Sequence, residues 1–138
     1  MGVKCQVVND WALPIAWEQV SPMLQKGLDM SHGEIALEDI YRDLCKGIGK
    51  LYVVVDNDAP IAAFIIELRE FRRKKVCFVP YIGGERLDEW CENMLGLAEE
   101  IARAEKAAAV YGMGRRGWAR KLRDSGYQEY YTTVGKEL

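Results

Sequence analysis

Three apolar runs that follow one another in the middle of the chain constrain its fold more than any other feature. LYVVVD covers residues 51–56, IAAFIIELREF covers 61–71 and VCFVPYI covers 76–82. Runs of this length that are rich in β-branched and aromatic residues are typical of buried strands. Only the short polar turns NDAP and RRKK separate them, and turns this short join antiparallel neighbours. The sequence therefore predicts a three-stranded antiparallel meander.

A short strand and two helices are expected before this meander. Residues 3–8 alternate well enough for an opening strand. The helix over 17–30 contains Pro22, which either lies in its first turn or kinks a longer helix. Ser31 and Glu34 have the spacing of a capping box, so we expect the second helix to begin there.

After the meander, helical and strand patterns alternate. From Arg86 the apolar residues recur with the period of a helix, and 108–113 is again a short apolar strand. A basic helix follows, which Gly126 would end, and QEYYTTVGKEL (128–138) alternates as a closing strand. The apolar stripe expected on the long helix comprises Leu87, Trp90, Cys91, Met94, Ala98, Ile101 and Ala102.

The expected order of elements is therefore β-α-α-β-β-β-α-β-α-β. The meander gives antiparallel pairs, whereas the later strand–helix–strand units require at least one parallel, right-handed crossover. One mixed sheet with helices on both faces satisfies both requirements, so the predicted class is α/β or α+β with a single mixed sheet. The chain has 138 residues, which is the length of one domain, 1–138.

Composition narrows the possible partners. The chain is 49% hydrophobic and 29% charged, as in ordinary globular proteins, and its net charge of -2 does not indicate a nucleic-acid-binding protein. No apolar run approaches the roughly 20 residues that span a bilayer, and we expect neither a signal peptide nor a lipid anchor. The four cysteines form no Cys-x-x-Cys pair and His32 is the single histidine, so we expect buried free thiols and no metal site.

The last quarter of the chain resembles a known family. GRRGWARKLRDSGYQEYYTTVGKEL (114–138), in which Gly126-Tyr127 stands where the family has Gly-Phe or Gly-Tyr, is similar to the final strand–helix–strand unit of the GNAT N-acyltransferases. The predicted element order extends this resemblance over nearly the whole chain. Together with GGERLDEW (83–90), the ending also resembles small phage-encoded GNAT-like proteins.

The resemblance implies a function and a setting. It implies acetyl-CoA or another acyl-CoA as cosubstrate, an amine as acceptor, no metal, and a cytoplasmic protein, in the host cytoplasm if phage-encoded. The alternative is a non-catalytic GNAT-fold protein that binds or assembles with a structural protein of a phage particle.

The stretch VPYIGGERLDEW (79–90) stands where the family holds the coenzyme A pyrophosphate. Its Gly-Gly pair lacks the family's spacing, and Glu85, Asp88 and Glu89 complement the helix dipole themselves and would repel a diphosphate. A degenerate phosphate loop and a plain strand-to-helix turn both remain open. The cofactor-binding residues that the resemblance implies are Phe78, Val79, Pro80, Tyr81, Ile82, Gly83, Gly84, Arg86, Arg115 and Arg116.

Acyl transfer to an amine needs a group that accepts the amine proton and a group that protonates the leaving thiolate. The tyrosine that often serves as the acid in the family corresponds here to Leu122. Tyr111 is the candidate acid in its place, and Glu67 is the candidate base, with Glu70 next to it. The alternatives are that Tyr111 belongs to the core and that the glutamates are solvated at a strand end.

The acyltransferase hypothesis makes one geometric demand. The strands 76–82 and 108–113 must diverge and leave a wedge that a thin thioester arm can enter. Trp11 and Trp17 lie in a stretch that borders the acceptor site in the family, or they simply cap the sheet. The RRKK turn is expected to be a solvated hairpin tip.

Overall fold

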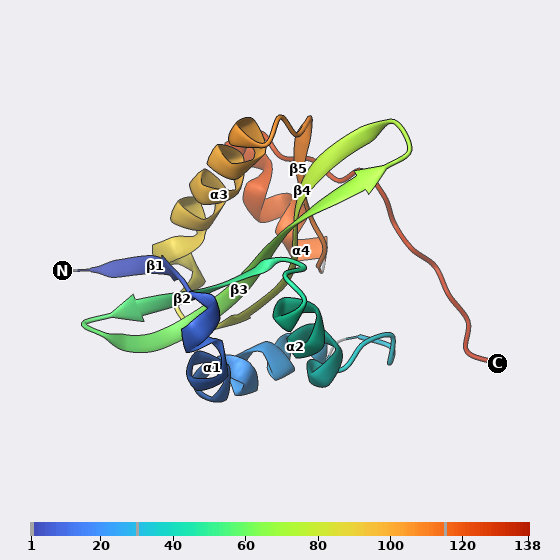
Figure 1. Ribbon diagram of the computed structural model, residues 1–138. Coiled ribbons are helices and arrows are strands. Elements are labelled where there is room, and N and C mark those ends of the chain that lie inside the picture. The colour runs from blue at the N-terminus through green and yellow to red at the C-terminus, as the bar shows by residue number, and fades with distance from the viewer. Residues whose placement is uncertain (1, 30, 115) are drawn as a thin grey trace.

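Five strands form one mixed sheet in the computed structural model, which describes residues 2–29, 31–114 and 116–138 (Figure 1). Their order in the sheet follows their order in the chain, with β1 to β4 antiparallel and β5 parallel to β4. The expected meander is therefore the centre of the sheet. The strands are β1 Val3–Val7, β2 Lys50–Asp56, β3 Ala59–Phe71, β4 Lys74–Gly84 and β5 Ala109–Gly112.

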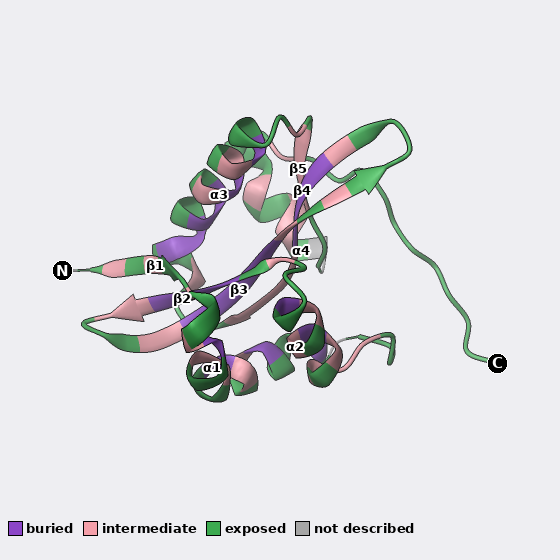
Figure 2. Ribbon diagram, in the orientation of Figure 1, coloured by how far each residue is buried: buried purple, intermediate pink, exposed green. Residues whose placement is uncertain are grey.

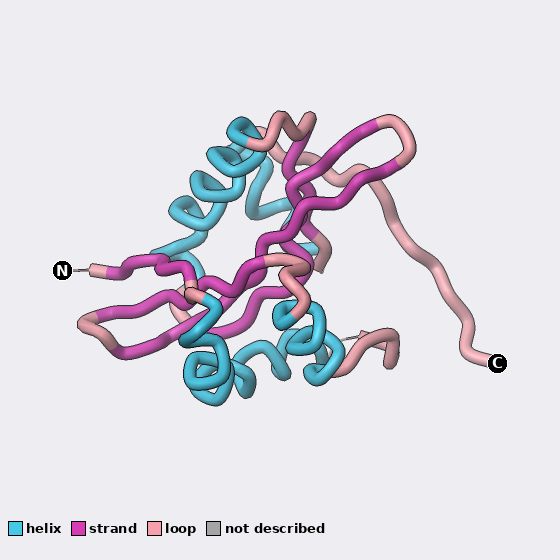
Figure 3. Tube along the Cα trace, viewed as in Figure 1, coloured by secondary structure: helices cyan, strands magenta, loops and turns pink. Residues whose placement is uncertain are grey.

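Helices cover both faces of this sheet, as the mixed pattern of the sequence predicts. α1 and α2 lie on one face, and α3 and α4 lie on the other (Figures 1 and 3). Within the described residues, no helix is both long and apolar enough to cross a bilayer. The helices are α1 Leu13–Leu28, α2 Leu37–Cys45, α3 Leu87–Ala104 and α4 Arg116–Leu122, with short 3-10 turns at Asp10–Ala12 and Arg123–Ser125.

The side-chain alternation of the strands builds one core on each face of the sheet. Under α3, the rings of Tyr52, Phe64 and Trp90 stack with centroid distances of 5.2 and 5.9 Å. Under α1 and α2, neighbouring strand residues such as Ala63 and Ile65 point the other way. Both layers are visible as the buried segments of the central strands and of the inner helix surfaces (Figure 2).

α1 crosses the end of β4 at unusually close range. A Cβ atom on Gly83 would lie 2.0 Å from the carbonyl oxygen of Met23, and a Cβ atom on Gly27 would lie 2.7 Å from the carbonyl oxygen of Ile82. Real side chains do not approach a backbone this closely, so glycine is required on both sides of the contact. The helix and the strand therefore pack backbone to backbone.

The first two helices begin at other residues than the sequence predicts. Pro22 lies inside the longer helix α1, the second of its two predicted positions. The expected capping box is wrong, because α2 begins at Leu37, where the Asp39 carboxylate accepts a hydrogen bond from the Ala36 N–H (2.9 Å). The Glu34 carboxylate instead accepts the His32 N–H (2.7 Å) within a non-helical segment.

The closing strand predicted at 128–138 is also wrong. Gly126 ends the last helical turn with φ of 89°, as expected, and the Tyr127 hydroxyl then donates a hydrogen bond to Glu99 (2.7 Å). Beyond this anchor the described chain forms no strand and runs away from the sheet (Figures 1 and 3). The Tyr130 ring meets the Tyr111 ring (5.5 Å), but Tyr131 and Val134 are 79% and 89% exposed, so the alternating pattern buries little apolar surface.

Replacing Gly83 by alanine should destabilise the protein by about 3 kcal/mol, because the new Cβ atom forces α1 and β4 apart. Gly96 on α3 is the matched control, since a Cβ atom there meets nothing within 4 Å. Gly96→Ala should raise stability by about 0.5–1 kcal/mol through helix propensity. Urea unfolding followed by circular dichroism measures both, and equal midpoints for the two variants would contradict the close crossing.

The four thiols should react in an order set by burial. Burial raises the pKa of Cys77 to about 11 and also raises the pKa of Cys91, so both stay protonated and unreactive at pH 8. Cys45 is exposed at the end of α2, contrary to the expectation that every cysteine is buried. Mass spectrometry after brief treatment with a thiol reagent should therefore find the label on Cys45 first. Equal labelling of Cys77 in the folded protein would contradict this core.

Candidate functional site

The pairing of β4 with β5 ends partway along β4, which is one condition for the expected wedge. The two strands pair from Val76 opposite Ala109 to Val79 opposite Gly112, and there β5 ends. β4 continues from Pro80 to Gly84, paired with β3 alone along its other edge. Among the described residues, no strand pairs with the edge of this last part of β4 that faces away from β3, and this edge is called its free edge below.

A bulge in β4 marks the point where the strands part. Ile65 pairs with Tyr81, but Glu67 pairs with Phe78, so Val79 and Pro80 together lie opposite Ile66. Pro80 has no N–H to donate, and a bulge is a position where a strand tolerates this. The extra residue also changes which face the following side chains point to. Val79 belongs to the core under α3, whereas Tyr81 packs on the side of α1 and α2.

The two predicted catalytic residues lie in one row across three strands. Glu67 on β3 is paired with Phe78 on β4, and Phe78 is paired with Tyr111 on β5. Neighbouring strands are about 4.8 Å apart, so Phe78 separates Glu67 from Tyr111 by roughly two strand spacings. The Tyr111 and Phe78 rings meet edge to face at 6.2 Å. The structure thus brings Glu67 and Tyr111 to the same face, next to the apex of the wedge.

Arg69 and Tyr81 lie on the same face of the sheet as this row, at nearby positions of β3 and β4, and neither is a candidate catalytic residue from the sequence. The Arg69 guanidinium lies 3.9 Å from the centroid of the Phe78 ring, and its Nε donates to the Glu67 carboxylate. Only 11% of the Glu67 side chain is exposed, whereas Glu70, the other candidate base, is exposed. Glu67 is therefore a partly buried carboxylate, held in one orientation rather than solvated at a strand end.

Tyr81 is, after Tyr111, the second candidate proton donor on this face, and it lies near Glu67. Burial raises the pKa of the Tyr81 hydroxyl, and the negative charge of Glu67 raises it further, although Arg69 opposes this. A phenol with a raised pKa keeps its proton at neutral pH. From the sequence, Tyr81 is expected only among the cofactor-binding residues that the resemblance implies, and the bulge that directs its side chain to this face is not apparent there.

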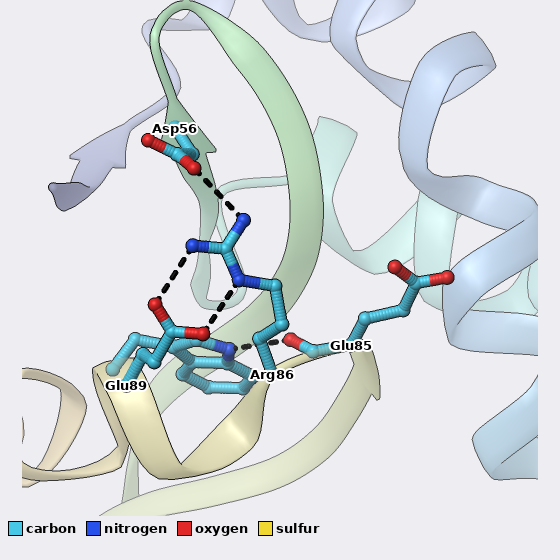
Figure 4. Close-up of polar contacts among 5 residues, drawn as sticks. Asp56, Glu85, Arg86 and Glu89 are labelled. Carbon is cyan, nitrogen blue, oxygen red and sulfur yellow. Dashed lines mark hydrogen bonds and ion pairs between the residues drawn. The ribbon is translucent and has the colours of Figure 1, made fainter.

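An ion-pair cluster of Asp56, Arg86 and Glu89 lies at the start of α3 (Figure 4). It is named the Arg86 clasp below. Arg86 is the N-cap residue with φ of 59°. Its Nε and Nη2 donate to the Glu89 carboxylate (2.6 and 2.7 Å), and its Nη1 donates to Asp56 (2.8 Å). Arg86 lowers the pKa of Glu89. Two carboxylates thus already neutralise this guanidinium.

The Gly-Gly turn before the clasp has a structural explanation. Gly83 is required by the crossing of α1, and Gly84 has φ of +125° with its Cβ position 2.4 Å from the Cα of Ala62. Packing alone therefore accounts for both glycines, whether or not the turn holds a phosphate. A pocket of about 140 Å³ beside the turn is lined by Met23, Lys26, Pro60, Ile61, Gly84 and Glu85.

The remaining charges around the clasp are mixed. Glu85 points away from Arg86 (Figure 4), and Asp88 pairs with Lys121 on α4. Arg115, predicted to bind the cofactor, lies outside the described residues. Arg116 opens α4, and only its backbone is described. Among the described residues, no cluster of three or more His, Cys, Asp or Glu side chains has the geometry of a metal site.

Comparison with solved structures identifies the fold. The aminoglycoside acetyltransferase meta-AAC0020 from an uncultured soil metagenomic sample matches with a TM-score of 0.70 and 11% identity, over 99% of this chain and 96% of that one. A predicted acetyltransferase with acetyl-CoA from Clostridium acetobutylicum matches with a TM-score of 0.71 and 10% identity, over 98% and 96%. AAC(6')-Iy in complex with a bisubstrate analog matches with a TM-score of 0.70 and 11% identity, over 100% and 99%.

Identities this low establish the architecture and not the activity. They confirm the predicted GNAT fold with its single mixed sheet. No protein-family model and no curated protein matches the chain.

The left-handed backbone of Arg86 gives a test of the clasp. Arg86→Ala and Arg86→Gly both remove the guanidinium, but only alanine keeps a Cβ atom at positive φ. We expect Arg86→Gly to be the more stable of the two in urea unfolding. We also expect added salt to reduce the difference between wild type and Arg86→Gly, because exposed ion pairs are screened. Equal stability of the two variants would contradict the assigned backbone.

Proposed function

We propose that this protein is an acetyl-CoA-dependent N-acetyltransferase. The observation that carries the proposal is the end of β4–β5 pairing at Val79 and Gly112, beside the row of Glu67, Phe78 and Tyr111. The free edge of Pro80–Gly84 offers backbone groups to the amides of an extended arm, in the manner of an added strand. Solved proteins of the same fold, at 10–11% identity, have been determined with acetyl-CoA and with a coenzyme A bisubstrate analog.

The side chains at the apex of the wedge have the chemistry that transfer to an amine requires. The cosubstrate supplies an acetyl group that is activated as a thioester. In the proposed reaction, the nitrogen of the acceptor amine bonds to the acetyl carbon, Glu67 takes the proton from that nitrogen, and the carbon–sulfur bond breaks. Tyr111 or Tyr81 gives a proton to the departing thiolate. Arg69 orients Glu67, since its Nε donates to that carboxylate.

A second candidate is the non-catalytic binding or assembly protein. The Arg86 clasp favours it, because the Arg86 guanidinium at the start of α3 already has two carboxylate partners. On this alternative, the wedge has no catalytic role and the protein binds a partner through its surface. A phage particle is the setting that the sequence resemblance implies for it, and the cytoplasm is the setting for the enzyme.

Calorimetry with coenzyme A separates the two candidates, and charge variants locate the anion. Glu85→Lys should tighten binding several-fold if the diphosphate lies at the start of α3, because it reverses a charge beside the turn. Glu100→Lys in the last turns of α3 makes the same change in net charge and should leave the affinity within about twofold. No heat at millimolar ligand for any variant would favour the non-catalytic candidate.

Turnover can be followed by release of the coenzyme A thiol in the presence of a panel of amines, namely an aminoglycoside, a polyamine and a lysine-containing peptide. Glu67→Gln should lower the transfer rate by about 10²- to 10⁴-fold, the usual range for loss of a general base. Glu70→Gln is the matched control on the opposite face of β3 and should keep the wild-type rate. Equal rates for the two variants would remove Glu67 from the mechanism.

A further inference from the structure

Four aromatic rings lie next to one another on the surface beside the tip of the β3–β4 hairpin. The centroid of the Phe71 ring is 6.0 Å from that of Tyr111, which is 5.5 Å from Tyr130, which in turn is 6.4 Å from Tyr131. Phe71, Tyr130 and Tyr131 are 49%, 55% and 79% exposed. These four rings are called the aromatic strip below. Three of them present ring surface to solvent that no core covers.

Three cations border the aromatic strip. Arg72 and Arg73 form the turn between β3 and β4, and Lys74 pairs with Phe71 across the hairpin. The Lys74 Nζ lies 5.4 Å from the centroid of the Tyr111 ring, within the range of a cation–π contact. All three side chains are exposed, and none of the described carboxylates lies within ion-pair distance of them. Their positive charge is therefore available to a ligand.

The carboxylates of the hairpin do not oppose an anion at this surface. Glu67 is already paired with Arg69 and is only 11% exposed. Glu70 pairs in the β3–β4 register with Lys75, one residue along from Phe71 and Lys74, and therefore points to the opposite face of the sheet. The hairpin thus presents unpaired cations and aromatic rings on one face.

This combination fits single-stranded nucleic acid. Its phosphates bind cations, and its unpaired bases each offer a face that stacks on an aromatic ring. An acidic peptide supplies the negative charge but no flat ring at each unit, and the bases of a duplex are already stacked on one another. Segment 69–75 contains five cations and one carboxylate although the whole chain carries a net charge of -2. The overall charge therefore does not describe this surface.

We propose that the hairpin turn and the aromatic strip bind single-stranded nucleic acid, with the three cations on phosphates and the bases on the exposed rings. The binding tracks the backbone and is tolerant of sequence, because every base has a face that can stack. This inference does not depend on the proposed acetyltransferase function, since neither the three cations nor the three exposed rings have a role in that reaction.

The test measures the fluorescence anisotropy of a labelled oligothymidylate of about 12 nucleotides, a length within the usual site sizes, on addition of the full chain. We expect binding at about 50 mM salt that is about 20-fold weaker at about 200 mM. Three phosphate contacts give this dependence, because they correspond to a slope of about -2 for the logarithm of affinity against the logarithm of salt concentration.

Charge reversal locates the phosphates. Arg72→Glu combined with Arg73→Glu should lower the affinity by about tenfold or more, because two contacts become repulsive. Lys4→Glu combined with Lys26→Glu makes the same change in net charge at exposed positions on β1 and α1, away from the hairpin, and should lower the affinity by less than about threefold.

Removal of single rings tests the stacking. Tyr131→Ala should lower the affinity by about fivefold or more, the loss expected for one stacked base. Its fold should be unaffected, since this ring is 79% exposed. Trp11→Ala is the matched control, because Trp11 is equally exposed (80%) but lies before α1, and this variant should bind like wild type.

Three results would each overturn the inference. The first is the absence of binding at about 50 mM salt. The second is an equal loss of affinity in a variant and its matched control, which would show that the hairpin surface is not the binding site. The third is competition by polyglutamate as strong as by unlabelled oligothymidylate, which would indicate a site for any polyanion.

Discussion

The close crossing of α1 over the end of β4 is the constraint on which the site depends. β4 loses its β5 neighbour after Val79, and an edge strand with only one partner is held weakly. Gly83 and Gly27 let the α1 backbone come into direct contact with this part of β4, while β3 pairs along its other edge. The last residues of β4 therefore keep their extended shape without help from β5. A wedge that stays open needs this kind of support, because an unsupported strand would close onto its neighbour or fray.

The bulge at Val79 and Pro80 provides the second condition, which is a change of side-chain direction at the apex. Before the bulge, β4 follows the register that puts Phe78 between Glu67 and Tyr111. After it, Tyr81 points to the same face as Glu67 rather than into the core under α3. A regular strand could present only one of these two arrangements. One extra residue thus leaves a candidate base and two candidate proton donors on one face while Val79 still fills the opposite core.

The sequence predicted what depends on local periodicity and missed what depends on long-range contacts. The meander and α3 follow from runs and periods that neighbouring residues set, whereas the separation of β4 from β5 is expected only from the family resemblance. From the sequence alone Gly83 is a candidate for a phosphate turn, because only the position of α1 shows that packing requires a glycine there. The direction of Tyr81 depends on a bulge that no local signal marks. The closing strand had the right alternation, but a strand also needs a partner surface, and the exposed tail shows that pattern alone does not supply one.

The two parts of the proposed site, the row with Glu67 and the start of α3, differ in whether their charged side chains must change partners before a ligand binds. Glu67 is shielded and already held by Arg69, so in the proposed reaction an acceptor amine would meet an organised carboxylate. At the start of α3, a diphosphate could bind Arg86 only by replacing Asp56 and Glu89 as its partners. The negative charges of these two carboxylates would also repel the diphosphate. These pairs are partly exposed and such pairs stabilise a fold only weakly, so the exchange of partners is a small free-energy step. The Arg86 clasp therefore does not exclude an anion, but it makes binding there depend strongly on salt. The recognition of a coenzyme A arm would then come mainly from the free edge of β4, and the acidic entrance would disfavour simple polyanions that cannot use that edge.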